Sequence, residues 1–249
     1  MNKLKKIIEL ITTSKKIVVL TGAGISTESG LPDFRSKDGF WTKNKPIQFQ
    51  EFINDKGKQR LSWNRNIELQ KILREINPNI GHAFVEKIIN LNNKENFLIT
   101  QNIDGLHQRS GISEEKIVEI HGNAIEAKCL NCEKKANILD FHAAIESNTP
   151  LPKCVNCNGI VKVATISFGQ PMNENDMLRA SRVSSQCDLM IVMGSSLSVM
   201  PAGQIPNLSI QSGAKLIILN REETIYDSIA DIVINDELKI ICSQLIKLI

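Results

Sequence analysis

Two pairs of cysteines are the clearest chemical signal in this chain of 249 residues. The first pair is Cys129 and Cys132, and the second, after 21 intervening residues, is Cys154 and Cys157. Each pair places two thiolates on one tight turn, and two such turns supply the four sulfur ligands of a tetrahedral zinc site. Two disulfides or a duplicated redox motif are the alternatives, and a reducing compartment disfavours the first. Since four thiolates fill the coordination sphere, we expect the zinc to hold a small insert together.

A glycine-rich loop is the second candidate, and it follows the β-branched run 17–20. The loop 22–27 reads Gly-Ala-Gly-Ile-Ser-Thr, which approaches a dinucleotide fingerprint except that Thr27 stands where the third glycine would be. Glycines let the backbone approach a pyrophosphate, and the N-terminus of a following helix attracts its charge. An ordinary strand-to-helix turn is the alternative that this loop alone leaves open.

Short apolar runs alternate with helical patterns along most of the chain, and they predict the elements that position these groups. Runs typical of buried strands lie at 17–20, 97–99, 117–120, 189–192, 216–219 and, more weakly, 232–234. Helical patterns lie at 82–91, 175–184, 201–211 and 237–249. This alternation predicts an α/β fold with a Rossmann-like parallel sheet and helices on both of its faces.

Two segments interrupt the alternation and predict inserts. Residues 39–79 have no strand pattern, but their apolar residues recur at helical spacing, which predicts a small helical insert. Residues 127–159 hold the four paired cysteines and predict a small zinc-binding insert. The predicted Rossmann-like domain is therefore discontinuous and comprises residues 1–38, 80–126 and 160–249.

Composition narrows the class of protein. Apolar residues make up 42% of the chain, and 30 basic against 27 acidic residues give a net charge of +3, which is too balanced for nucleic-acid binding by bulk electrostatics. The apolar runs are far shorter than the roughly 20 residues that cross a bilayer. The basic N-terminus lacks the apolar core of a signal peptide. We therefore expect a cytoplasmic protein with neither a nucleic-acid nor a membrane partner.

Four blocks of polar residues lie at the ends of predicted strands, where open α/β sheets bind ligands. They are residues 21–36, which contain Asp-Phe-Arg, residues 100–111, which contain Gln-Asn-Ile-Asp, the His-Gly-Asn of 121–123, and the Gly-Ser-Ser-Leu of 194–197. With these blocks and the cysteine pairs, nearly the whole chain resembles the sirtuin family of bacterial type. Sirtuins are NAD-dependent protein lysine deacylases.

The resemblance implies NAD as cosubstrate and one structural Zn²⁺ held by Cys129, Cys132, Cys154 and Cys157. Asn102 and Asp104 match the pair that orients the nicotinamide and its ribose, and Phe34 matches a lid that shields the reactive sugar carbon from water. The positions that match the family's NAD contacts are Gly22, Ala23, Gly24, Ser26, Asp33, Phe34, Arg35, Gln101, Asn102, Ile103, Asp104, Gly194, Ser195, Ser196, Asn220 and Arg221.

The catalytic residues that the resemblance implies are His121 and Asn102. His121 matches the family's general base, and an imidazole with an unperturbed pKa of about 6.5 can take a proton from a ribose hydroxyl at neutral pH. The implied products are free lysine, O-acyl-ADP-ribose and nicotinamide. His107 also lies in a family motif, and we expect a structural role for it.

The implied partner is an acylated-lysine protein or peptide, which the family binds as an added strand. Ile166, Phe168 and Gly169 match one edge of this site, and Val199 matches the other. Gln170 stands where the family usually has glutamate, which removes a negative charge near the peptide groove.

The acyl group is expected to be neutral, with acetyl first. Sirtuins that prefer acidic acyl groups carry a Tyr-x-x-Arg pair, and the one tyrosine of this chain is Tyr226, far from the matching stretch 61–66. That stretch contains Trp63 and Arg65 and resembles a branch of the family with weak acetyl activity and broader acyl preferences. Longer or branched acyl groups are therefore alternative substrates that the sequence leaves open.

Two other functions are compatible with parts of the pattern. Mono-ADP-ribosyl transfer or NAD hydrolysis would use the same NAD site with a different final acceptor. A non-catalytic zinc-ribbon module on an inactive Rossmann scaffold, such as a nucleic-acid adaptor, belongs to another class. The intact set of Arg35, Asn102, Asp104 and His121 argues against that second alternative.

Overall fold

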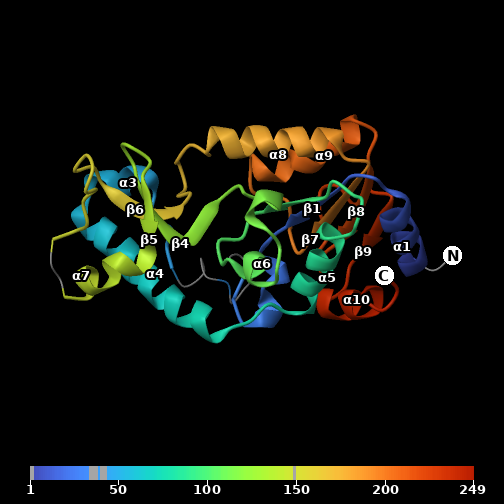
Figure 1. The fold of residues 1–249 in the computed structure, drawn as a ribbon, viewed down its shortest axis with the longest axis horizontal. Helices are drawn as coiled ribbons and strands as arrows, with labels where there is room; N and C mark the ends of the chain where they lie inside the picture. Colours follow the sequence, from blue (N-terminus) through green and yellow to red (C-terminus); the bar gives the residue numbers. More distant parts are fainter. Residues whose placement is uncertain (1–2, 34–38, 40–43, 148–149) are drawn as a thin grey trace.

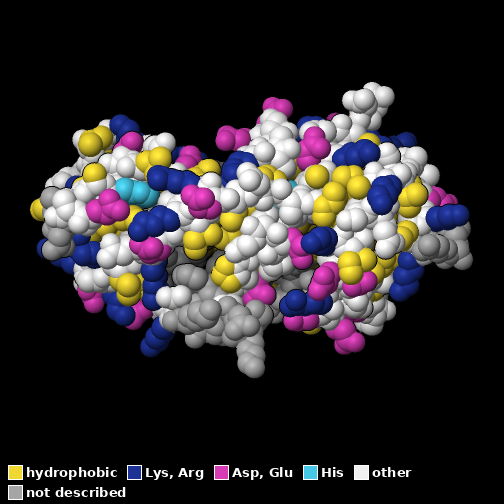
Figure 2. All heavy atoms as spheres, turned by 90° about the horizontal axis from the view of Figure 1, so that it is seen from below, with side chains coloured by type: hydrophobic (Ala, Val, Ile, Leu, Met, Phe, Trp, Pro, Cys, Tyr) yellow, Lys and Arg dark blue, Asp and Glu magenta, His cyan; other side chains and the backbone are white. Residues whose placement is uncertain are grey.

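The computed structural model describes residues 3–33, 39, 44–147 and 150–249 of the chain. Within these ranges no helix is both long enough and apolar enough to span a membrane. On the face of the molecule seen in Figure 2, Lys and Arg side chains are interspersed with Asp and Glu, and no extended field of one sign covers it.

The larger part of the molecule is a six-stranded parallel sheet with the strand order β3-β2-β1-β7-β8-β9 (Figure 1). The direction of strand order reverses between β1 and β7, and sheets of this kind bind ligands beyond the carboxyl ends of their strands at such a point. The predicted Rossmann-like sheet is confirmed. Its strands are β1 (Ile17–Thr21), β2 (Phe97–Thr100), β3 (Ile117–Glu119), β7 (Leu189–Met193), β8 (Lys215–Leu219) and β9 (Ile232–Ile234).

Helices cover both faces of this sheet because its buried strands present apolar side chains on both sides. Ile17 and Val19 of β1 belong to one apolar core, whereas Val18 and Leu20 belong to the other. The first core is covered by α1 (Lys3–Thr13), α5 (Ile80–Ile89) and α10 (Leu238–Leu245). The second is covered by α8 (Glu174–Gln186) and α9 (Ile205–Gln211), the upper layer in Figure 1.

A smaller lobe, at the left of Figure 1, contains both predicted inserts. Its antiparallel sheet has the order β5-β4-β6, and the helices α3, α4 and α7 belong to the same lobe. The sheet extends on both sides of residues 127–159, since its first strand begins at Gly122 and its last ends at Thr165. The elements are α3 (Phe49–Asn54), α4 (Lys56–Glu75), β4 (Gly122–Cys129), β5 (Lys135–Asn137), α7 (His142–Glu146) and β6 (Val161–Thr165).

The two inserts share one apolar core. Trp63 of α4 is 1% exposed and belongs to the same cluster as Ala127, Cys129 and Val163 of the antiparallel sheet. Its ring centroid lies 5.4 Å from that of Phe141, in the turn before α7. The long helix of one insert is therefore packed against the cysteine-bearing sheet of the other. A substitution in the core of either insert should therefore disturb the packing of both.

Candidate active site

A cleft of about 1090 Å³ is lined by residues of both lobes and by the loops that follow β1, β2, β7 and β8. Phe34 and Arg35, the two lid residues predicted beside Asp33, lie outside the described residues. Every described residue predicted to bind NAD or peptide, or to act as the base, lines the cleft. These residues are Gly22, Ala23, Gly24, Ser26, Asp33, Gln101, Asn102, Ile103, Asp104, His121, Ile166, Phe168, Gly169, Gly194, Ser195, Ser196, Val199, Asn220 and Arg221.

The glycine loop after β1 touches the loop after β7 backbone to backbone. The N–H of Gly24 donates to the carbonyl of Gly194 at 2.9 Å. A Cβ at Gly22 would lie 2.8 Å from the same carbonyl oxygen, and one at Gly24 would lie 2.9 Å from the Gly194 Cα. These glycines are therefore required by the contact between the loops, in addition to any approach of a phosphate.

The helix expected after the glycine loop takes the form of two short 3₁₀ turns rather than an α-helix. Residues 23–29 form two 3₁₀ turns, η1 (Ala23–Ile25) and η2 (Thr27–Ser29). Gly30 then takes a left-handed conformation with φ of 101°, which ends the second turn. The partial positive charge predicted for the helix N-terminus would therefore come from two short turns, and it is smaller than that of a full α-helix.

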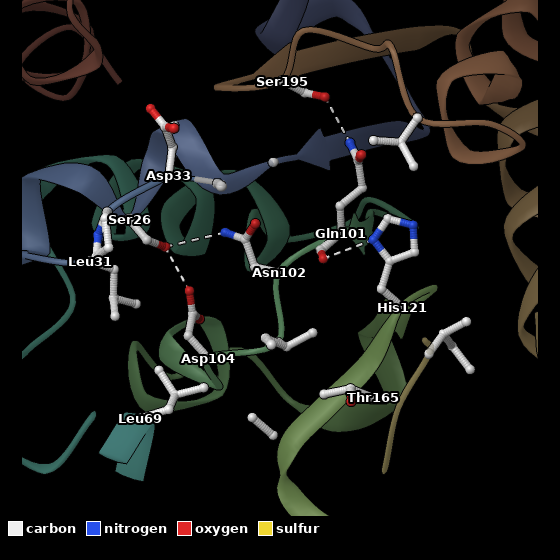
Figure 3. A pocket seen from close by; sticks show the side chains of 18 of the residues that line it. Ser26, Leu31, Asp33, Leu69, Gln101, Asn102, Asp104, His121, Thr165 and Ser195 are labelled. Carbon is white, nitrogen blue, oxygen red and sulfur yellow. Dashed lines mark hydrogen bonds between the residues drawn. The ribbon is translucent and has the colours of Figure 1, made fainter. Parts of the chain in front are cut away.

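Ser26, Asn102 and Asp104 form a buried polar cluster on the wall of the cleft (Figure 3). The Ser26 hydroxyl donates to Asp104 Oδ2 at 2.7 Å and accepts from Asn102 Nδ2 at 3.2 Å. Burial raises the pKa of Asp104, although hydrogen bonds from the Leu106 N–H and from Ser26 oppose this. Asn102 Oδ1 is buried without a hydrogen-bond partner among the described residues. A ligand that brings an amide N–H or a hydroxyl, as NAD does, fits this oxygen.

Two buried histidines, His82 and His107, lie close to this cluster, with ring centroids 4.9 Å apart. His82 Nδ1 accepts the Asn79 N–H at 3.2 Å, and His82 Nε2 lies 3.5 Å from the Ser26 hydroxyl. His107 Nε2 lies 2.9 Å from the hydroxyl of Thr21 at the end of β1. Burial lowers the pKa of His82 to about 4 and also lowers the pKa of His107, so both rings are neutral at pH 7. These hydrogen bonds and the contact between the two rings indicate a structural role for both histidines.

His121 lies just before β4, on the other side of Gln101 from Ser195 (Figure 3). Its Nδ1 lies 3.1 Å from the Gln101 carbonyl oxygen. Because a carbonyl only accepts, the neutral ring carries its proton on Nδ1 and its lone pair on Nε2. Gln101 Nε2 donates to Ser195 Oγ at 2.8 Å, which ties the end of β2 to the loop after β7. The backbone beyond β2 thereby fixes the tautomer of His121.

The loop after β8 forms another part of the cleft wall. Asn220 is 8% exposed, and its Nδ2 donates to the Glu222 carbonyl at 2.7 Å. Arg221 is exposed and lies 3.7 Å from the Glu222 carboxylate. Ser196 is exposed beside Ser198, with the two hydroxyl oxygens 2.8 Å apart. Polar side chains that suit a ribose or an adenine thus line the cleft at the ends of β7 and β8.

The two segments predicted to bind a peptide both line the cleft. The Ile166 N–H donates to the His121 carbonyl at 2.8 Å, so the segment 166–169 runs directly beside the residue matched to the base. The Phe49 N–H of α3 donates to the Phe168 carbonyl at 2.8 Å, and the Phe168 side chain is 40% exposed. Val199 is half-buried in the other segment.

One face of α4 supplies a further wall that the sequence only partly predicted. Leu61, Arg65, Leu69 and Ile72 line the cleft at helical spacing, whereas only the stretch 61–66 was assigned to the acyl pocket. Arg65 is half-buried in this wall, and its Nη1 donates to the Lys45 carbonyl at 3.0 Å. The same helical period that buries Trp63 on the opposite face could have identified Leu69 and Ile72.

The four paired cysteines meet in one cluster, as predicted. Their sulfur atoms all lie within 4.8 Å of one another, and the Cys129–Cys157 and Cys132–Cys154 sulfur pairs are each 3.5 Å apart. A tetrahedron with Zn–S bonds of about 2.3 Å requires sulfurs roughly 3.8 Å apart, so the cluster fits Zn²⁺. Backbone N–H groups lower the pKa of Cys129 to about 6, which favours the thiolate that zinc binds.

Comparisons with known proteins agree with this geometry. The profile of the Sir2 family matches residues 22–201. The chain is 43% identical to NAD-dependent protein deacetylase 1 of Bradyrhizobium diazoefficiens, over 92% of this chain and 90% of the relative. It superposes on a structure of Sir2 with a p53 peptide and NAD⁺ with a TM-score of 0.86, at 35% identity and 98% coverage of both chains. Sir2Tm bound to a propionylated peptide gives a TM-score of 0.85 at 34% identity, covering 100% of this chain and 98% of the other.

Proposed function

The chain belongs to the Sir2 family, and we propose that it uses NAD to remove acyl groups, acetyl foremost, from protein lysine side chains. The observation that carries the proposal is the convergence of His121, Asn102 and Asp104 on one cleft with both predicted peptide segments. A deacylase needs all of these groups around one ribose carbon. Mono-ADP-ribosyl transfer and NAD hydrolysis need the NAD contacts but no groove for an acylated peptide.

In this proposal the two facing loops and the inner polar cluster bind NAD. Bound NAD supplies the ribose carbon from which nicotinamide departs. The loops at Gly22 and Gly194 would allow close approach of the pyrophosphate, and Asn220 and Arg221, which line the same cleft, would contact the adenosine half. The unpartnered Asn102 oxygen and the Asp104 carboxylate orient the nicotinamide and its ribose.

His121 is the proposed general base. Its Nδ1–H is held by the Gln101 carbonyl, so Nε2 is the atom that receives a proton from a ribose hydroxyl. The carbonyl can stabilise the imidazolium that forms, because it continues to accept the Nδ1–H. An adjacent backbone thus holds the ring in one tautomer throughout the reaction.

The substrate is proposed to be an acylated protein segment that lies between the segment 166–169 and Val199. Phe168, whose side chain is 40% exposed, offers an apolar surface for the lysine methylenes. We propose a cytoplasmic enzyme, because a reducing compartment keeps the four zinc thiolates from forming disulfides. The zinc itself is proposed to be structural, since four sulfurs leave no open coordination position.

The test is product analysis with NAD in the presence and absence of an acetyl-lysine peptide. The proposal expects nicotinamide release that depends on the peptide and matches the formation of free lysine and O-acetyl-ADP-ribose. Equal nicotinamide release without peptide would indicate NAD hydrolysis, and an ADP-ribosylated peptide would indicate transfer to protein. Binding of DNA with no turnover of NAD would favour the adaptor alternative.

We expect acetyl-lysine to be removed at least about ten-fold more efficiently than succinyl-lysine, a difference of about 1.4 kcal/mol in transition-state binding. A buried carboxylate is costly without a cation and hydrogen bonds, and the chain has no tyrosine in the cleft wall. Arg65 is a cation in the wall formed by α4, but its guanidinium already donates to the Lys45 carbonyl. The measurement is kcat/KM for matched acetyl- and succinyl-lysine peptides.

The control for this prediction is Arg65→Gln. Equal or reversed efficiencies in the unmodified enzyme, with succinyl activity lost in Arg65→Gln, would show that Arg65 serves the acyl group and that the prediction is wrong. Unchanged acetyl activity in that variant is expected, because the neutral acyl group needs no cation.

A further inference from the structure

A buried lysine lies behind the predicted peptide-binding segment. Lys162 of β6 is 2% exposed and is among the largest fully buried side chains of the described chain. Its Nζ donates to the carbonyl of Thr165 at 2.5 Å and to that of Val163 at 3.2 Å. The ammonium lies 5.7 Å from the ring centroid of Phe52 in α3. These contacts connect the end of β6 to a helix of the smaller lobe.

The charge of Lys162 has no counter-charge in the described ranges, where no carboxylate lies within ion-pair distance of its ammonium. Burial lowers the pKa of Lys162 to about 7, which reflects the cost of removing the charge from water. An apolar side chain of similar length would avoid this cost. The stability of the fold alone therefore does not account for a lysine at this position.

The groups that Lys162 holds are those that shape the predicted peptide edge. Thr165 is the last residue of β6, and the next residue, Ile166, begins the segment 166–169. Phe52 belongs to α3, whose first residue, Phe49, donates its N–H to the Phe168 carbonyl. Lys162 thus contacts both elements that support this segment. These are strand β6, which leads into the segment, and helix α3, which donates a hydrogen bond to it. Figure 1 shows α3 and β6 together in the smaller lobe.

We propose that Lys162 is a positioning residue for the acyl-lysine peptide: its ammonium fixes the Thr165 carbonyl and α3, and thereby the segment 166–169 that binds the peptide. This inference rests on the proposed function. It assigns Lys162 no contact with the substrate or with NAD. Its loss should therefore affect binding of the peptide and leave binding of NAD unchanged.

The experiment compares the unmodified enzyme with Lys162→Met and Lys162→Arg. We expect Lys162→Met to raise the KM for an acetyl-lysine peptide about ten-fold, with the KM for NAD within about twofold of that of the unmodified enzyme. Lys162→Arg keeps a cation with several donors and should restore most of the peptide affinity.

Lys94→Met is the matched control. Lys94 Nζ also donates only to carbonyls, those of Ile11, Thr12 and Ser14 at the end of α1, away from the cleft. The melting temperature of that variant should fall, and its KM for the peptide should be unchanged. A purely structural role for Lys162 would make its methionine variant behave in the same way.

A peptide KM within about twofold of the unmodified enzyme in Lys162→Met, or an equal rise in the KM values for peptide and NAD, would overturn the inference. If Lys162→Met folds poorly, the same criteria apply to Lys162→Leu, which also removes the N–H donors. The affinity of a labelled acetyl-lysine peptide in the absence of turnover is measured in parallel. Failure of the proposed function would appear as absent deacylation by the unmodified enzyme, whereas failure of this inference would appear as equal peptide affinity in both proteins.

Discussion

Replacing His121 with alanine is expected to lower the rate of deacylation at least about 100-fold, or about 2.7 kcal/mol in transition-state free energy, with the fold intact. The ring is held by the Gln101 carbonyl through Nδ1, so its Nε2 lone pair is positioned to receive a proton. Alanine removes this acceptor, and the loss of one half-buried ring is a small perturbation of the core. The measurement is kcat for an acetyl-lysine peptide at saturating NAD, with the melting temperature as the check on folding.

His142→Ala is the control for that variant. His142 begins α7 in the smaller lobe and does not line the cleft. Its replacement should leave kcat within about twofold of the unmodified enzyme. A folded His121→Ala enzyme that deacylates at a comparable rate would contradict the assignment of the base. Unchanged affinity for NAD in His121→Ala would separate a loss of chemistry from a loss of cosubstrate binding.

The features that could be predicted from sequence are those that local patterns carry. The parallel strands appear as β-branched runs because both faces of the sheet are buried, and the strand predicted at 232–234 has those bounds in the structure. The cysteine pairs predict their own cluster because two short turns have few ways to present four thiolates. The polar blocks at strand ends meet in one cleft since parallel strands end at the same edge of a sheet.

The features that could not be predicted depend on contacts between distant segments. Helix α1 buries Ile7 and Ile11 against the sheet, but its many lysines obscure that pattern, and no helix was predicted there. Trp63 joins the cysteine-bearing sheet across more than sixty residues, a contact that no local pattern contains. Lysine side chains are usually exposed, and no strand was predicted around Lys162, whose burial depends on contacts with Phe52 and the Thr165 carbonyl.

The zinc site is the second place where a single substitution should lower activity strongly, because two of its cysteines belong to the core that α4 shares with the antiparallel sheet. Cys129 is 1% exposed and belongs to the same apolar cluster as Trp63, whose helix also forms a wall of the cleft. Zinc binding contributes roughly 10–16 kcal/mol in small zinc modules, where the free energy of metal binding is free energy of folding. Loss of one thiolate should therefore release both the sheet and α4.

We expect Cys129→Ser, or chelation of the metal, to abolish zinc binding and to lower kcat/KM for the peptide more than about ten-fold. The measurements are the zinc-to-protein ratio, expected to be one in the unmodified enzyme, and the fluorescence of Trp63 in a Trp41→Phe background, which should shift as the indole meets water. Cys187→Ser is the matched control, because Cys187 already contacts the Ser184 carbonyl and the Ser209 hydroxyl and a serine can keep those hydrogen bonds. A stable, active Cys129→Ser enzyme without zinc would show that the core of Trp63 holds the lobe together by itself. Loss of activity with unchanged tryptophan fluorescence would instead show that the metal acts on the cleft by a route other than α4.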